Sequence, residues 1–92
     1  MPNFEWDPDK AARNLREHKV TFEASTRVFD DPFAFDEIDD EEDCGEERSK
    51  ILGMVERRLL FVTYTLRGGT TRIISARPAE PVERRKYHEA KR

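Results

Sequence analysis

The chain has 92 residues, 40% of them charged and 36% hydrophobic, which is enough for one modest core and predicts a single domain spanning residues 1–92. It has no apolar run of about 18 residues, which excludes a transmembrane helix, and its first residues lack the basic start and apolar stretch of a signal peptide. The single cysteine, Cys44, excludes an internal disulfide and leads us to expect a cytoplasmic protein.

The net charge of −3 conceals a strong asymmetry between the two halves of the chain. Residues 1–47 hold 5 basic and 16 acidic side chains, whereas residues 48–92 hold 12 basic and 4 acidic ones. A half this basic attracts polyphosphate, and the attraction should weaken with salt. The composition equally allows the two halves to neutralise each other across the fold.

The N-terminal region predicts an edge strand followed by a helix. Residues 4–6 alternate in polarity, as in a short strand. Asp7 can cap the following helix, and Pro8 suits its first position. We expect this helix to run to about Glu17, with an apolar face made of Ala11, Ala12 and Leu15. At its end, His18 is assigned a capping or packing role in preference to catalysis.

A second short helix and an acidic segment follow. Thr21 is its N-cap candidate, and Pro32 after two aspartates ends it. Residues 33–35 then return to extended structure, with their phenylalanines expected in the core. From residue 36 to residue 47, nine of twelve residues are acidic, which predicts a solvated loop. Calcium binding is disfavoured because the spaced ligands and turn glycine of a calcium loop are missing, and Cys44 with its acidic neighbours is a poor nucleophile.

The C-terminal half predicts most of the sheet and a last helix. Residues 48–55 form one strand candidate, and residues 59–77 form a hairpin around Arg67-Gly68-Gly69. A weakly apolar helix runs from Pro81 to about Lys91 and has Val82 and Tyr87 for contacts. The predicted order is β-α-α-β-β-β-β-α, an α+β fold with a small antiparallel sheet, two N-terminal helices and one C-terminal helix.

The basic half carries the one constellation suited to chemistry, which consists of Arg67, Arg72, Arg77, Arg84, Arg85, Tyr64 and Tyr87. Guanidinium groups bind phosphate through a bidentate fork, and aromatic rings stack on unpaired bases. In a regular strand, Arg72 would lie on the opposite face from Ser75 and Arg77, so at least two surfaces would be basic. RNA cleavage needs no metal, since the 2′-hydroxyl can attack its own phosphate.

The acid and base of such a reaction remain open at this point. The side chains that qualify by type are Glu46, Glu47, Glu83, His88, Tyr64 and Tyr87. Their spacing does not choose among them, and the residues alone favour a basic binding surface over a nuclease.

An ordered set of segments resembles the toxins of the BrnT type. In the first half the matching segments are Phe4–Pro8, Lys10–Leu15, His18, Val20–Glu23 and Val28–Pro32. In the second half they are Gly45–Arg48, Gly53, Val62–Thr65, Arg67-Gly68, Arg72–Arg77, Glu83-Arg84 and Tyr87. The resemblance covers nearly the whole chain in the right order.

The resemblance implies a type II toxin with a RelE-like fold, a metal-independent endoribonuclease that arrests translation and growth. It implies a BrnA-type antitoxin with a ribbon-helix-helix-like DNA-binding domain, through which the complex contacts operator DNA. The catalytic candidates at matching positions are Arg67, Arg72, Arg77, Arg84, Tyr87, Glu47 and Tyr64. We expect RNA to be bound by Arg48, Lys50, Arg85 and Lys86, without metal or cofactor.

Two features depart from the family pattern. Lys19 stands where the family usually has glycine, and a left-handed helix end there would cost about 1 kcal/mol, which leaves the geometry of this turn open. The acidic run could weaken RNA binding if it borders the active face. The alternative function is a non-catalytic module that binds RNA, the ribosome or a protein.

Overall fold

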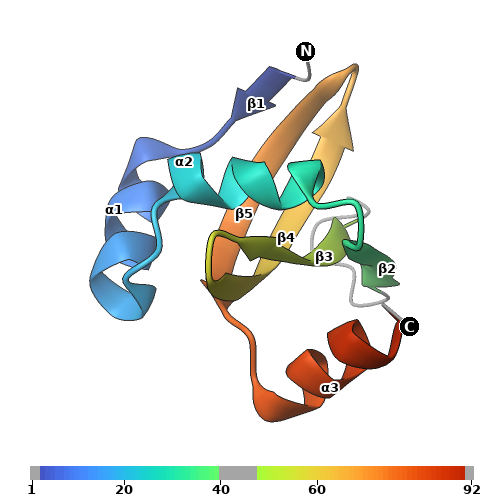
Figure 1. The fold of residues 1–92 in the computed structure, drawn as a ribbon. Coiled ribbons are helices and arrows are strands. Elements are labelled where there is room, and N and C mark those ends of the chain that lie inside the picture. Colours follow the sequence, from blue (N-terminus) through green and yellow to red (C-terminus); the bar gives the residue numbers. More distant parts are fainter. Residues whose placement is uncertain (1–2, 40–47, 91–92) are drawn as a thin grey trace.

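The computed structural model describes residues 3–39 and 48–90 and has the α+β architecture expected from the sequence (Figure 1). The strands are β1 (Asn3–Glu5), β2 (Phe35–Asp39), β3 (Arg48–Val55), β4 (Arg58–Arg67) and β5 (Thr70–Pro78). The helices are α1 (Pro8–His18), α2 (Phe22–Ser25), the 3-10 helix η1 (Thr26–Asp30) and α3 (Pro81–Ala90). The predicted order of elements is confirmed. None of the described helices is long and apolar enough to span a membrane.

One sheet contains all five strands in the order β1-β5-β4-β3-β2. The three pairs among β2, β3, β4 and β5 are antiparallel, as expected, but β1 runs parallel to β5 over three residue pairs. The sheet is therefore mixed. After β1, the chain passes through α1, α2 and η1 and enters the sheet again at the opposite edge, as β2.

The N-termini of α1 and α2 are capped by the residues that the sequence predicts. The Asp7 carboxylate accepts a hydrogen bond of 2.9 Å from the Asp9 N–H, and the Thr21 hydroxyl accepts one of 3.0 Å from the Ala24 N–H. At the end of α1, Lys19 takes the left-handed conformation, with φ 59° and ψ 33°, and its N–H donates to the Leu15 carbonyl. The turn thus keeps a geometry suited to glycine although a lysine occupies it.

Replacing Lys19 with glycine is expected to raise the free energy of unfolding by up to about 1 kcal/mol, because glycine adopts positive φ without a steric penalty. Urea unfolding of the two proteins measures the difference. A Lys19→Ala variant serves as the control, since it removes the same side chain but keeps the Cβ, and it should not be stabilised. A destabilised Lys19→Gly variant would contradict the prediction.

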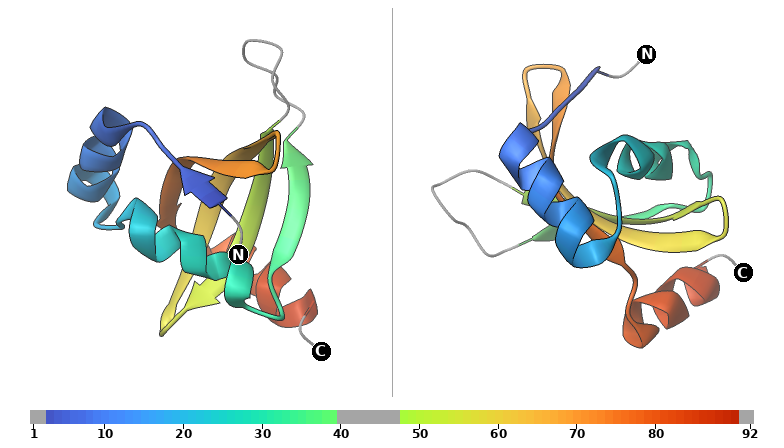
Figure 2. Two further views of the ribbon diagram at one scale, coloured as in Figure 1. Left: turned by 90° about the horizontal axis from the view of Figure 1, so that it is seen from above. Right: turned by 90° about the vertical axis from the view of Figure 1, so that its left-hand side faces the viewer.

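Two apolar clusters lie on opposite faces of the sheet. Figure 2 shows α2 and η1 on one side of the sheet and α3 on the other. The first joins the N-terminal helices to the sheet and contains Val20, Phe22, Val28, Ile51, Val55, Leu60, Val62, Tyr64, Ile73 and Ala76. The second contains Leu52, Leu59, Ala79 and Tyr87, with Met54 and Phe61 packed against it. Because Tyr87 belongs to α3, this helix covers the second face, which we call the α3 face.

Several apolar side chains lie outside these clusters. Leu15, expected on the buried side of α1, is 47% exposed, and Val82, expected to hold α3, is 59% exposed. Phe33 and Phe35 are also exposed. The residue that α1 does bury is Asn14, whose amide nitrogen donates to the carbonyls of Val20 and Ala76 at 2.9 and 2.7 Å.

The amide oxygen of Asn14 accepts a hydrogen bond of 3.1 Å from the Ala76 N–H. Asn14 therefore hydrogen-bonds both backbone groups of Ala76 on β5, as a neighbouring strand would. This is the reason α1 packs along β5 through an amide rather than through Leu15.

The first part of the acidic run is a strand and not the solvated loop expected from composition. Strand β2 includes residues 36–39 and pairs with β3, with Glu37 opposite Lys50 and Asp39 opposite Arg48. The opposite charges of Glu37 and Lys50 at facing positions favour such a pairing, which outweighs the low strand propensity of acidic residues. The remainder of the run, with Cys44 and Glu47, lies outside the described residues.

A bulge changes the alternation of side chains along β5. Thr63 faces Ser75 and Tyr64 faces Ile73, so Ile74 is an extra residue opposite β4. On either side of it, Arg72 faces Thr65 and Arg77 faces Phe61. Both arginines therefore project from the α3 face, whereas a regular strand would have placed them on opposite faces.

Candidate active site

Arg77 and Glu83 form the centre of the α3 face. Arg77 lies near the end of β5 and Glu83 in the first turn of α3, and their side chains make two parallel contacts, Nη1 to Oε1 at 2.9 Å and Nη2 to Oε2 at 2.8 Å. Glu80 lies 3.5 Å from the same guanidinium. The Glu83 carboxylate also accepts a hydrogen bond of 2.8 Å from the Glu80 N–H, which fixes it at the start of the helix.

This geometry keeps both groups charged. Hydrogen bonds to Glu83 raise the pKa of Arg77 and outweigh its partial burial. Burial alone would raise the pKa of Glu83, but hydrogen bonds from Arg77 and from the Glu80 backbone, with the charges of Arg77 and Lys50, hold it below the ordinary 4.5. At neutral pH the pair is therefore a carboxylate beside a guanidinium.

Phe61 brings a second cation into the group. The Arg77 guanidinium lies 4.8 Å from the centre of the Phe61 ring, and the Lys50 ammonium lies 5.6 Å from it. Both distances are typical of cation–π contacts. Two positive charges and one carboxylate thus surround one aromatic ring on the α3 face, an arrangement suited to a phosphate with a base stacked beside it.

Arg72 shares this face but is held by a different carboxylate. Its guanidinium lies 2.7 Å from Glu5, which is its neighbour on β1. The pair joins the short first strand to the sheet. Arg72 is therefore oriented toward the edge of the sheet, away from Arg77 along β5.

The two tyrosines expected at the site are held elsewhere. Tyr64 lies in the cluster on the opposite face and donates a hydrogen bond of 3.1 Å to Asp36. Tyr87 lies on the α3 face but is buried, and its hydroxyl donates to Asp31 at 2.6 Å. Burial, followed by the nearby carboxylate, raises the pKa of each tyrosine to about 12. Both therefore stay protonated near neutral pH.

The other expected residues are dispersed. Arg67 lies at the end of β4, beside the hairpin turn whose glycines both have positive φ. Arg84, Arg85 and Lys86 are exposed on α3. Glu47 lies outside the described residues, while Arg48 and Lys50 lie half-buried at the start of β3. The structure thus brings Arg77 and Lys50 together and leaves the rest of the set apart.

Sequence reasoning did not select Glu83 and Phe61 for this site. Glu83 was one of several acids suited by type, and the signal that distinguishes it is its place in a helix start directly after the strand that carries Arg77. Phe61 was not singled out, because nothing in an alternating strand shows which apolar side chains lie at the margin of a helix packed on the sheet.

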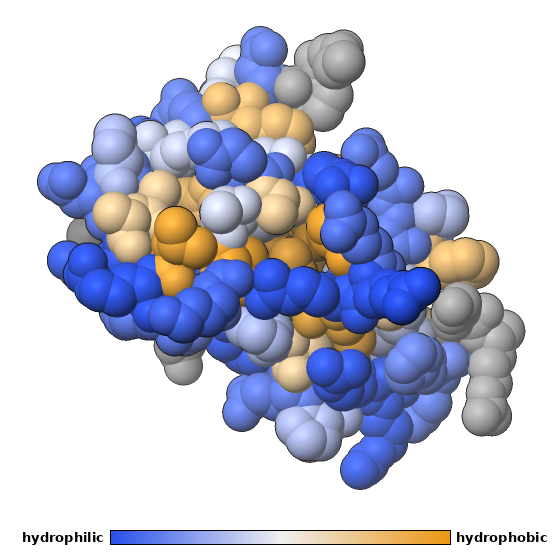
Figure 3. Space-filling view, turned by 60° about the vertical axis from the view of Figure 1, so that its left-hand side comes forward, coloured by the Kyte–Doolittle hydropathy of each residue, from blue (hydrophilic) through white to orange (hydrophobic). Residues whose placement is uncertain are grey.

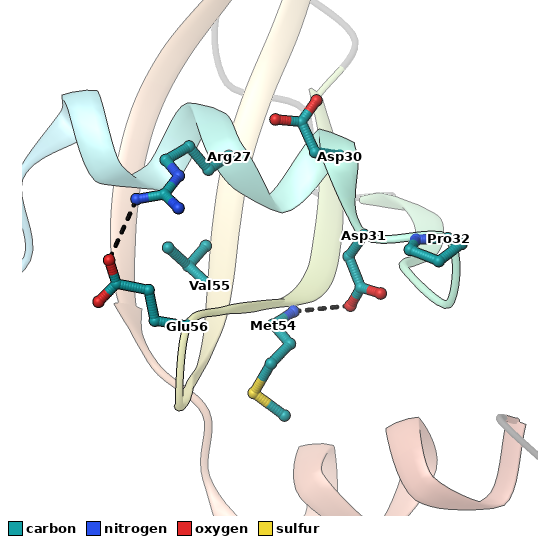
Figure 4. A pocket seen from close by; sticks show the side chains of 7 residues that line it. All are labelled: Arg27, Asp30, Asp31, Pro32, Met54, Val55 and Glu56. Carbon is teal, nitrogen blue, oxygen red and sulfur yellow. Dashed lines mark hydrogen bonds and ion pairs between the residues drawn. The ribbon is translucent and has the colours of Figure 1, made fainter.

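Two hollows open on the surface outside the Arg77 centre. The first, of about 280 Å³, is lined by Arg27, Asp30, Asp31, Pro32, Met54, Val55 and Glu56 (Figure 4). Its polar groups largely bond to one another, since Arg27 contacts Glu56 at 3.3 Å and Asp31 accepts from the Met54 N–H at 2.8 Å. The second, of about 300 Å³, lies between α1 and the sheet.

A model of the protein family described as "Ribonuclease toxin, BrnT, of type II toxin-antitoxin system" matches residues 6–83 of this chain. The matched segment runs from the residue before the α1 cap to Glu83 and so includes Lys50, Phe61 and Arg77. A comparison with curated proteins found no match.

Proposed function

Because this chain belongs to the BrnT family of ribonuclease toxins of type II toxin–antitoxin systems, we propose that it cleaves RNA at the Arg77–Glu83 centre without a metal ion. The observation that carries the proposal is the bidentate contact of these two residues beside Lys50 and Phe61. A carboxylate that accepts a proton and a guanidinium that stabilises developing negative charge are the two groups this reaction requires.

In the proposed reaction, the Glu83 carboxylate takes the proton of a ribose 2′-hydroxyl. The 2′-oxygen bonds to phosphorus, the bond from phosphorus to the 5′-oxygen breaks, and water supplies the proton for that leaving oxygen. Arg77 stabilises the added charge on the phosphate, since its described contacts with Glu83, Glu80 and the Pro78 carbonyl involve Nη1 and Nη2, and the guanidinium also has an Nε–H donor. The products are a 2′,3′-cyclic phosphate and a 5′-hydroxyl.

Loss of RNA then arrests translation and growth, and the toxin acts in the cytoplasm. Membership of a type II toxin–antitoxin family implies an antitoxin partner. We propose that this partner is of the BrnA type and that its ribbon-helix-helix-like domain binds operator DNA for the complex.

One observation favours a second candidate, a module that binds RNA, the ribosome or a protein without cleaving RNA. Glu83 and Glu80 already neutralise much of the charge of Arg77. If that pair is only structural, the basic surface binds and does no chemistry.

The purified protein is expected to cut a defined single-stranded RNA in EDTA and to leave 2′,3′-cyclic phosphate ends. The same RNA carrying 2′-O-methyl groups should resist, because its 2′-oxygen has no proton to lose. Mass spectrometry of the fragments identifies the ends. Cleavage of the methylated RNA, or fragments with 5′-phosphates, would refute the proposed chemistry, and binding without fragments would favour the second candidate.

A further inference from the structure

The second hollow, between α1 and the sheet, is lined by positively charged side chains that take no part in the proposed reaction. We call it the α1 hollow. It is lined by Lys10, Arg13, Asn14, Glu17 and His18 from α1, by Arg48 from β3, and by Ile74 and Ser75 from β5. The face drawn in Figure 3 has apolar side chains gathered near its centre between hydrophilic ones. The residues that line the α1 hollow, by contrast, are polar or charged except for Ile74. A polar occupant therefore suits it better than an apolar one.

The cations of the α1 hollow differ from the two arginines on the α3 face of β5. Arg72 and Arg77 are each paired with a carboxylate. Within residues 3–39 and 48–90, by contrast, Lys10, Arg13 and Arg48 make no ion pair, although Glu17 lies in the same hollow. Positive charges gathered without partners repel one another, and an anion placed among them removes that repulsion.

Arg48 supplies a second, independent observation. Its Nε atom is buried and has no hydrogen-bond partner in the part of the chain that the structure describes. Buried donors without partners are rare in folded proteins. An oxygen-rich ligand in the hollow would accept this hydrogen bond, and a phosphate matches the geometry of a guanidinium.

The walls of the hollow are fixed in place before any ligand binds. The amide nitrogen of Asn14 donates to the carbonyls of Val20 and Ala76, and the amide oxygen accepts from the Ala76 N–H. These hydrogen bonds hold α1 against β5. The bulge in β5 places Ile74 and Ser75 beside the helix. The cations of α1 thus face β5 on a rigid support, and a bound group would require little reorganisation.

The hollow and the active site share one strand. Ser75 lines the hollow, and Arg77 lies two residues further along β5. Two residues of a strand span about 7 Å, so a single RNA strand can contact both sites. We propose that the α1 hollow binds a phosphate group of the RNA chain adjacent to the cleaved one; the choice of RNA as the source of that phosphate rests on the proposed function.

The test compares two exposed arginines of the same helix. Arg13 lines the hollow and Arg16 does not, so Arg13→Ala and Arg16→Ala remove the same charge at different places. The probe is a short single-stranded RNA with 2′-O-methyl groups, whose dissociation constant is measured by fluorescence anisotropy across a salt series. Arg48→Gln is a further variant, and thermal unfolding of every variant shows that it is folded.

Arg13→Ala is expected to weaken binding about fivefold to tenfold and to reduce the slope of log K against log salt by about 0.7, the value for one lost phosphate contact on a single strand. Arg16→Ala should change the affinity less than about twofold. Equal losses in the two variants would show a general effect of charge and overturn the inference, as would no loss in either.

The same measurements distinguish failure of the phosphate site from failure of the proposed function. Cleavage by the native protein with equal binding of Arg13→Ala and Arg16→Ala would leave the function standing and remove the phosphate site. Binding that depends on Arg13, without cleavage of an unmethylated RNA, would keep the phosphate site and remove the nuclease. A native protein that binds no RNA overturns the inference.

Discussion

Replacing Arg77 with alanine is expected to lower kcat/KM for cleavage of single-stranded RNA by about 100-fold or more, because in the proposed reaction it removes the donor that stabilises the charge of the transition state. Its side chain is 31% exposed and its ion pair with Glu83 is short. The loss of stability should be no more than about 1 kcal/mol, since solvent screens a partly exposed pair. Single-turnover cleavage rates and urea unfolding measure the two effects independently.

Three further variants show whether the lost activity reflects loss of a catalytic group or loss of an ion pair. Glu83→Gln keeps the shape of the pair and should lose activity to a similar degree, because an amide cannot take the 2′-proton. Arg77→Lys keeps the charge and should recover only part of the rate, since it lacks the bidentate fork. Arg27→Ala breaks an exposed arginine–glutamate pair with Glu56 in the first hollow and should leave cleavage within about twofold. If folded Arg77→Ala kept most of the native rate, Arg77 would not belong to the active site.

The ionised carboxylate of Glu83 also predicts that the cleavage rate depends on pH. Its pKa lies below 4.5 in the folded protein, so it is ionised and able to accept a proton at neutral pH. As the pH falls through that lowered pKa, both the base and its pairing with Arg77 are lost together. The acid limb of a kcat/KM profile should therefore lie below pH 4.5 and vanish in Glu83→Gln.

Asn14→Leu is expected to lower the free energy of unfolding by about 3 kcal/mol or more. Leucine fills a similar volume but leaves three buried backbone groups without their partners, the Val20 carbonyl and both polar groups of Ala76. Urea unfolding measures the change. The neighbouring Leu15→Ala is the control, because Leu15 is 47% exposed and should cost less than about 1 kcal/mol. The reverse order of effects would mean that α1 is packed on its other side.

The same two residues show how far the sequence predicts the fold. Caps at Asp7 and Thr21, the glycine turn and the order of elements follow from local rules and were found where expected. The periodic pattern, however, selected Leu15 for the core of α1. Asn14 is buried because it hydrogen-bonds Ala76, which lies 62 residues further along the chain. Local patterning around Asn14 carries no information about such a distant strand.

The grouping of side chains in the candidate site follows from the sequence only in part, for a comparable reason. Arg77 and Lys50 were selected by charge, and the fold brings them to one aromatic ring. Tyr64 and Tyr87 suited the chemistry by type, but their hydroxyls bond to Asp36 and Asp31, which depends on tertiary packing. Glu83 was not singled out, because its contact with Arg77 needs the turn between β5 and α3.

The extra residue in β5 also bears on how this chain can change in length. On either side of Ile74, one face of the strand carries Arg72 and Arg77, while the other carries Ile73 and Ala76 in the apolar cluster. Removal of Ile74 would restore regular alternation and leave both faces unchanged, because Arg72 and Arg77 would then lie four residues apart. Natural relatives that lack one residue between Arg72 and Arg77 should therefore also lack the bulge, and both arginines should stay on the α3 face.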